Sequence, residues 1–213
     1  ILNPYDEWYA LVRALELKEA NGGSVTVVNV GSAENDQVIR KALAIGADDA
    51  IRIDVTGDAD SFAIASEIAA VAKSGGYDMV LLGKETINYN GSALGGMLAE
   101  LLDLPFISYA SKLDIAGNTA TIEREIEGGK ETVSVKLPAV IAGQKGLVEE
   151  KDLIIPNMRG IMTARTKVLT VLEPVEAPIN TKAVKFEKPA PKSAVKLIPA
   201  DNLDELINLD RKS

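Results

Sequence analysis

The hydrophobic pattern of the chain alternates between helix-like and strand-like segments as far as about residue 105. Apolar residues recur at helical spacing in residues 4–20, 32–45 and 60–73. Short, nearly continuous apolar runs, typical of strands buried on both faces, occupy residues 25–30, 50–55 and 77–82. This order predicts an α/β fold: a doubly wound, mostly parallel, Rossmann-like sheet of the kind that binds adenine nucleotides, with helices on both faces.

The strand at residues 77–82 leads through a polar, glycine-flanked loop into an amphipathic helix that begins after Ser92. The first backbone amides of a helix have no partner within the helix and favour an anion such as phosphate. The loop contains no histidine, no cysteine and no paired acid and base. It therefore predicts a site that holds a nucleotide and does not cleave one.

The chain begins at a helix start, with Asn3 as a cap and Pro4 in the first turn. Doubly wound domains usually begin with a strand. We therefore expect the first strand and its loop to precede Ile1.

The pattern changes after residue 105. Three short strand-like runs, separated by Gly117-Asn118 and Gly128-Gly129, predict a small antiparallel meander at the edge of the sheet, over residues 111–115, 119–126 and 131–137. One more buried strand is expected at residues 137–142. The following stretch, residues 144–165, reads as irregular, and its apolar residues indicate a contact surface. These residues are Ile154, Ile155, Met158, Ile161 and Met162.

The last forty or so residues differ in composition from the rest. Prolines and lysines alternate from Glu173 to Pro199, with too few apolar residues for a core. A short amphipathic helix is predicted at residues 200–209. We therefore divide the chain into a nucleotide-binding domain, residues 1–172, and an extended C-terminal arm, residues 173–213. The arm is either a disordered tail or a segment that wraps around a partner.

Composition narrows the possible functions. The net charge of −8 argues against nucleic acid or an anionic membrane surface as the main partner. The absence of cysteine and histidine excludes disulfides, thiolate or histidine metal sites and histidine-based catalysis, so we predict no catalytic and no metal-binding residues. No apolar run approaches the roughly 18 residues needed to span a membrane, and no signal peptide is visible.

Six blocks of the sequence, in register and in order, resemble the small (beta) subunit of electron transfer flavoprotein. They lie at residues 3–6, 40–48, 81–84, 123–129, 137–140 and 160–162. The resemblance extends from Asn3 to about Val171. It implies an electron carrier that is not an enzyme, paired with a large (alpha) subunit that holds most of a redox FAD. It also implies electron flow from flavin dehydrogenases, such as acyl-CoA dehydrogenases, to a quinone oxidoreductase.

The resemblance further implies a second nucleotide in the small subunit, which is AMP in simple carriers and a second FAD in electron-bifurcating relatives. The positions that would line it are Asn3, Pro4, Tyr5, Asp6, Val30, Gly83, Lys84, Glu85, Thr86, Ile87, Asn88, Asn90, Gly91, Ser92, Ala93 and Leu94. The positions that would dock a dehydrogenase are Met158, Ile161 and Met162. The chain departs from the family where an Asp-x-Asp pair and a glutamine are usual, because it has Asn88, Asn90 and Ala93 there.

Three other interpretations remain open. An electron-bifurcating subunit would carry an FAD that reacts with NADH. A stand-alone stress-type module would share the fold but would not need the meander or the arm. An ATP-cleaving pyrophosphatase is suggested only by residues 74–78, which precede a strand where that class has its loop after one. We expect a bacterial cytoplasmic protein in preference to one of the mitochondrial matrix.

Overall fold

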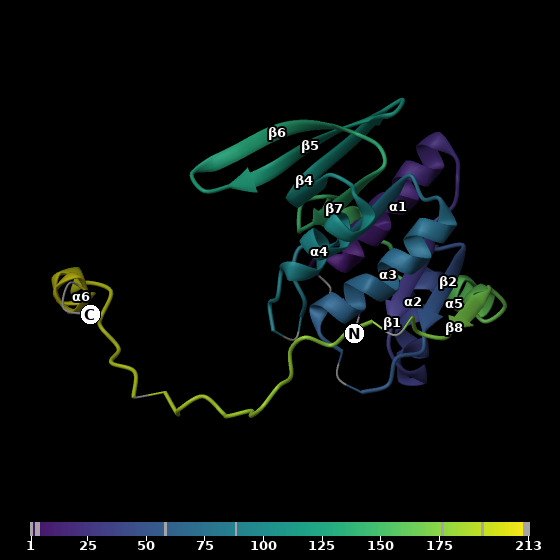
Figure 1. Ribbon diagram of the computed structural model, residues 1–213. Coiled ribbons are helices and arrows are strands. Elements are labelled where there is room, and N and C mark those ends of the chain that lie inside the picture. The colour runs from purple at the N-terminus through teal and green to yellow at the C-terminus, as the bar shows by residue number, and fades with distance from the viewer. Residues whose placement is uncertain are drawn as a thin grey trace. The chain divides into compact units, whose positions relative to one another are not determined.

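The structure is a computed structural model that describes residues 2, 5–57, 59–87, 89–175, 177–192 and 194–210 (Figure 1). It contains two compact units, residues 1–182 and 183–213. The helices of the first unit are α1 (Glu7–Asn21), α2 (Asp36–Ile45), α3 (Ser61–Gly75), α4 (Ala93–Leu102) and α5 (Met158–Ala164). Its strands are β1 (Thr26–Val30), β2 (Asp49–Ile53), β3 (Met79–Gly83), β4 (Phe106–Ala116), β5 (Thr119–Ile126), β6 (Gly129–Lys136), β7 (Ala139–Gly143) and β8 (Leu169–Leu172).

The strands form two sheets. One is a parallel sheet with the order β1-β2-β8, and the other has the order β3-β7-β4-β5-β6. In the second sheet β3 and β4 flank β7 in parallel, and β4, β5 and β6 continue as the predicted antiparallel meander to the edge. The α/β class and the parallel strands are confirmed. The described strands form two separate sheets, and β8 was not predicted at all.

Helices cover both faces of the sheets. Neighbouring residues of β7 show this, because Ile141 packs in a cluster with α1 and α2 whereas Val140 packs with α3 and α4. Successive side chains of a strand point to opposite faces, so the two clusters lie on opposite sides. All five residues of β7 are buried, which explains their uniformly apolar or small side chains.

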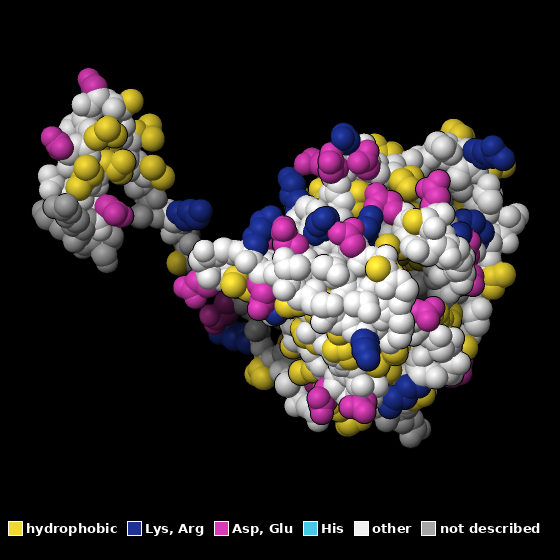
Figure 2. Space-filling model, turned by 90° about the horizontal axis from the view of Figure 1, so that it is seen from above, with side chains coloured by type: hydrophobic (Ala, Val, Ile, Leu, Met, Phe, Trp, Pro, Cys, Tyr) yellow, Lys and Arg dark blue, Asp and Glu magenta, His cyan; other side chains and the backbone are white. Residues whose placement is uncertain are grey.

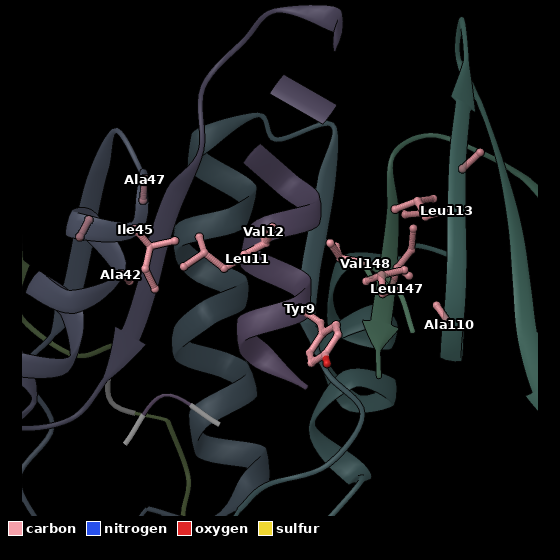
Figure 3. Close-up of a cluster of buried hydrophobic side chains, with 14 of the residues drawn as sticks. Tyr9, Leu11, Val12, Ala42, Ile45, Ala47, Ala110, Leu113, Leu147 and Val148 are labelled. Atoms are coloured by element: carbon pink, nitrogen blue, oxygen red, sulfur yellow. The ribbon is translucent and has the colours of Figure 1, made fainter. Parts of the chain in front are cut away.

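Helix α1 connects the cores of the two sheets. Tyr9, Leu11 and Val12 are buried in one cluster. This cluster also contains Ile45, the last residue of α2, and Leu113 of β4. Figure 3 shows Leu11 reaching toward Ile45, on the side of α1 away from Leu113. Burying side chains of this size stabilises the fold by about 1.5–3 kcal/mol each.

The facing edges of the two sheets border a large cavity. Strand β1 is the edge of the first sheet and β3 is the edge of the second, and residues of both line a cavity of about 960 Å³. Apolar residues of the neighbouring helices complete the lining, among them Leu11, Ile68 and Leu98. Two strands with an edge unpaired among the described residues thus border one cavity, which is lined by both apolar and polar residues.

Two carboxylates of the α3 region hold the chain where it leaves β8. Asp60 caps α3 by accepting a hydrogen bond from the backbone N–H of Ala63, at 2.9 Å. Its other oxygen accepts the backbone N–H groups of Asn180 and Thr181, both at 2.7 Å. Glu67, which is 4% exposed, accepts the backbone N–H of Val175 at 2.9 Å. The chain therefore remains bonded to the first unit as far as Thr181.

The second unit contains the helix α6 (Leu203–Asp210), close to the predicted position. Four of its apolar side chains, Leu203, Leu206, Ile207 and Leu209, are between 42% and 61% exposed. Figure 2 shows apolar side chains gathered on this unit and acidic and basic side chains interspersed over the visible face of the first unit. Within the described residues, none of the helices has the length and apolar character required to cross a membrane.

Candidate functional site

The predicted anion loop is a closed turn between β3, which ends at Gly83, and α4, which begins at Ala93. The backbone N–H of Thr86 donates to the carbonyl of Gly91 at 3.0 Å, and the Thr86 hydroxyl accepts the Gly91 N–H at 3.2 Å. Asn90 donates to the Thr86 carbonyl at 2.9 Å and has a positive φ of 52°, which asparagine tolerates better than most residues. These bonds fix the loop directly before the helix.

The start of α4 is open to a ligand. Ser92 stands at the N-cap without making a side-chain cap hydrogen bond, and Ser92 and Ala93 are exposed. Gly95 brings the first turn close to the sheet, because a Cβ there would lie 2.6 Å from the Phe106 ring and 3.3 Å from Leu82. The first-turn amides of α4 are therefore held next to the carboxyl end of β3, where an anion would be stabilised.

The start of α1 meets the same end of β3. A Cβ on Gly83 would lie 2.8 Å from the Cβ of Asp6, so only glycine permits this approach. Asp6 is 3% exposed, and burial raises the pKa of its carboxyl, although the charge of Lys84 and a hydrogen bond with the Glu85 backbone act in the opposite direction. The carboxyl is thus largely removed from solvent and lies near a lysine.

The ammonium group of Lys84 lies beside an aromatic ring and a carboxylate. Its Nζ lies 5.6 Å from the centre of the Tyr109 ring and 3.8 Å from a Glu85 carboxylate oxygen, and neither distance is that of a close hydrogen bond. Tyr109 has a positive φ of 57° at an irregularity of β4, which is rare for a bulky residue. Such conformations cluster at ligand sites. Tyr109 was not predicted, because the surrounding sequence reads only as a strand.

A cavity of about 630 Å³, within the usual size range of ligand pockets, brings seven of the sixteen predicted residues together. Its lining contains Tyr5, Asp6, Lys84, Glu85, Thr86, Ile87, Asn90, Glu125, Gln144 and Lys145. Gly83, Gly91, Ser92 and Leu94 line the larger cavity beside it, together with Lys84, Glu85 and Thr86. Ala93 and Val30 appear in neither lining, and Val30 pairs with Ile53 at the end of β1. Asn3, Pro4 and Asn88 lie outside the described residues.

Three lining residues were missed by the sequence reasoning. Gln144 and Lys145 follow β7, whose last residue, Gly143, pairs with Gly83 at the end of β3. The backbone N–H of Lys84 donates to the Gly143 carbonyl at 3.0 Å, so the two strand ends open at the same place. Gln144 and Lys145 follow a buried strand, as Lys84 does, so the same signal in the sequence would have found them. Glu125 is the third, and its position in the meander carried no such signal.

The predicted docking residues lie on α5, where the sequence had suggested irregular structure. The Asn157 side chain caps this helix by accepting the Gly160 N–H at 2.8 Å. Met158, Ile161 and Met162 are 74%, 40% and 57% exposed. A glycine in a segment of seven residues weakens the helical signal, which explains the difference.

The fold and site define a doubly wound α/β protein with a nucleotide-sized cavity at the carboxyl ends of β3 and β7 and an exposed apolar helix. The profile of the electron transfer flavoprotein domain matches residues 1–177. The chain belongs to the electron transfer flavoprotein family, within which it corresponds to the small (beta) subunit: an electron carrier that is not an enzyme, whose partner is an alpha subunit.

Three relatives illustrate this likeness, each named electron transfer flavoprotein subunit beta. The protein of Bacillus subtilis is 36% identical over 99% of this chain and 86% of its own length. That of Syntrophomonas wolfei is 35% identical over 91% of this chain and 76% of its own length. The human protein is 36% identical over 81% of this chain and 68% of its own length.

Proposed function

We propose that this chain binds AMP in the cavity beside the 84–92 loop while its alpha subunit supplies most of an FAD site. The observation that carries the proposal is that the uncapped start of α4 and Lys84 line the same larger cavity, while Lys84 also lines the smaller cavity beside it. Both features favour a phosphate. FAD supplies the redox chemistry, and this chain contributes positioning and charge around it.

The lining supports AMP in preference to a second FAD. Its cations are Lys84 and Lys145, and Lys145 is already paired with Glu150 at 3.1 Å. Asp6, Glu85 and Glu125 contribute three carboxyl groups to the same cavity. One anionic group at Lys84 therefore fits this lining better than a bridged pair of phosphates. An FAD that accepts hydride from NADH, as in a bifurcating subunit, is the competing occupant.

The test is the nucleotide content of the complex. The chain is co-expressed with its alpha subunit, the purified complex is denatured, and the released nucleotides are separated and quantified. We expect one AMP and one FAD per heterodimer. Two FAD would show a bifurcating carrier, and one FAD without AMP would show that the loop with Asn90 and Ala93 does not bind a second nucleotide.

We also propose that α5 docks flavin dehydrogenases, such as acyl-CoA dehydrogenases, and that electrons pass on to a quinone oxidoreductase. Three exposed apolar side chains on one short helix support this proposal, since methionine adapts well to different surfaces. We expect replacement of Met158 by aspartate to slow reduction by a dehydrogenase and to leave the FAD content unchanged. An unchanged rate would refute the docking role.

The C-terminal part supports a further proposal about the partner. We propose that residues 183–213 wrap around the alpha subunit, since the apolar side of α6 is exposed in its own unit. A chain ending at Lys182 should then fail to co-purify with the alpha subunit, and co-purification would refute the wrapping role of these residues.

We propose a bacterial cytoplasmic location, because similar proteins occur in bacteria, although some relatives are named mitochondrial. Fractionation of the source cells tests this.

The cavity between β1 and β3 supports the expectation of a further strand. Strand β1 is parallel to β2, and strand β3 is parallel to β7. Among the described residues, β1 and β3 each have one unpaired edge, and both edges border the cavity. The start of α1 lies beside Gly83, at the carboxyl end of β3. A strand running parallel to β1 and β3 would therefore end close to α1 and could continue into it. It would join the two sheets into one.

A further inference from the structure

Little hydrophobic packing holds α5 on the protein. Ala164 is its one buried residue. Its larger apolar side chains, Met158, Ile161 and Met162, are exposed. The burial of a single alanine methyl group contributes little to stability. Other contacts must therefore keep this short helix in place.

The first such contact comes from α2. Arg40 donates from Nη1 to the backbone carbonyls of Ala164, at 2.7 Å, and Lys167, at 2.6 Å. These carbonyls belong to the end of α5 and to the residues just after it. Cations are favoured at such ends, where carbonyl groups lack partners in the helix.

The second contact runs in the opposite direction. Lys167 follows α5, and its Nζ donates to the carbonyl of Leu43 at 3.0 Å and to that of Ala47. Leu43 lies in the last turn of α2, and Ala47 lies two residues after that helix ends. Each of the two helices thus has its C-terminal carbonyls bound by a cation from the other segment. We call this pair of contacts the carbonyl clasp of Arg40 and Lys167.

The clasp draws the two helices into backbone contact. A Cβ on Gly160 would lie 2.5 Å from the carbonyl oxygen of Ala44, so there is space only for glycine. The Asn157 cap fixes the other end of α5. The helix is therefore held at both ends and in the middle by polar and backbone contacts, and its apolar side chains stay exposed.

We propose that Arg40 and Lys167 are positioning residues for docking, which fix α5 so that Met158, Ile161 and Met162 are presented to a flavoprotein dehydrogenase. The inference rests on the proposed docking function of α5. Arg40 and Lys167 influence docking through the backbone carbonyls that they bind, which hold α5 in place. Loss of the clasp would leave the three apolar side chains on a segment without a fixed orientation, and binding would have to restore that order.

The experiment compares two substitutions of Arg40 in the heterodimer with its alpha subunit. Arg40→Met keeps the length of the side chain and removes its hydrogen-bond donors, whereas Arg40→Lys keeps a cation that can donate. Lys167→Met tests the other half of the clasp. The control is Lys73→Met, an exposed lysine in the last turn of α3. Hydrogen exchange of residues 158–167 is measured, together with reduction of the heterodimer by a purified acyl-CoA dehydrogenase.

We expect exchange of the α5 amides to become faster by about 10-fold in Arg40→Met and Lys167→Met. We expect KM for the heterodimer to rise on the order of 10-fold while kcat and the FAD content stay unchanged. Arg40→Lys should restore much of both properties, and Lys73→Met should behave as the unmodified protein. A side chain with a merely structural role would not raise KM alone.

Unchanged exchange in Arg40→Met and Lys167→Met would overturn the clasp. Faster exchange with an unchanged KM would overturn its role in docking. If the dehydrogenase did not reduce the unmodified heterodimer, the docking function itself would be refuted, and the positioning role with it. The exchange data would still distinguish that failure from a failure of the clasp.

Discussion

Two adjacent glycines of α4 allow a matched test of how the helix is seated at the nucleotide cavity. A Cβ on Gly95 would lie 2.6 Å and 2.7 Å from two atoms of the Phe106 ring. A Cβ on Gly96 would lie 3.9 Å from the same ring, which is ordinary contact. Gly95→Ala must therefore displace the ring or the first turn of α4, whereas Gly96→Ala fits without movement.

The two substitutions share the stability gain of replacing a glycine in a helix, and they differ in the cost of overpacking. Each alanine gains about 0.5–1 kcal/mol because it restricts the unfolded chain more than glycine does. This gain cancels in the comparison. Overpacking at Gly95 costs about 1–3 kcal/mol, so Gly95→Ala should be less stable than Gly96→Ala by that amount. At about 2–4 °C per kcal/mol for a chain of this size, a Tm difference of several degrees is expected.

The assay is thermal unfolding of the heterodimer for both variants, followed by measurement of retained nucleotide. Gly95→Ala should also lose nucleotide faster, because the displaced turn carries the amides of the anion site. Gly96→Ala should retain it and be slightly more stable than the unmodified protein. Equal Tm values for the two variants would refute the seating of α4 on Phe106. A stability loss without any loss of nucleotide would refute the link between this turn and the ligand.

Three further predictions concern other parts of the molecule. Lys84→Gln should lower nucleotide affinity on the order of 10- to 100-fold, measured by retention during dialysis; full retention would contradict a phosphate contact. Hydrogen bonds from the backbone N–H groups of Ala63, Thr181 and Asn180 lower the pKa of Asp60 below its ordinary 3.8, so its hold on residues 180–181 should persist at neutral pH and be lost as the pH falls through the lowered value. The protection factors of the Asn180 and Thr181 amides, which are corrected for the intrinsic pH dependence of exchange, should show this loss at low pH. Asp60→Ala should abolish the loss, and the same pH dependence of protection in the variant would exclude Asp60 as the titrating group. The outward-facing edges of β1 and β3 have no sheet partner among the described residues, so their amides should exchange faster than those of β7, which is paired on both sides; equal protection would argue against two separate sheets.

Local sequence signals predicted the strand, the turn and the helix around the 84–92 loop. The apolar run of β3, the turn residues after Gly83 and the helical spacing after Ser92 each have a local physical cause. The conformation of Tyr109 had no such signal, because its positive φ arises from an irregular pairing of β4 with β7. The short strand β8 was missed because it pairs with β2, far away in the sequence. The division into two sheets likewise depends on long-range pairing.

The carbonyl clasp also has a consequence for the maturation of the subunit. Arg40 and Ala164 are separated by 124 residues, so their hydrogen bond closes a long loop. Contacts between distant parts of a chain are slow to form, because the entropy of loop closure must be met first. We expect α5 to settle on α2 only after most of the domain has folded. An unfinished chain would then present no ordered surface to a dehydrogenase, and electrons would enter only completed subunits.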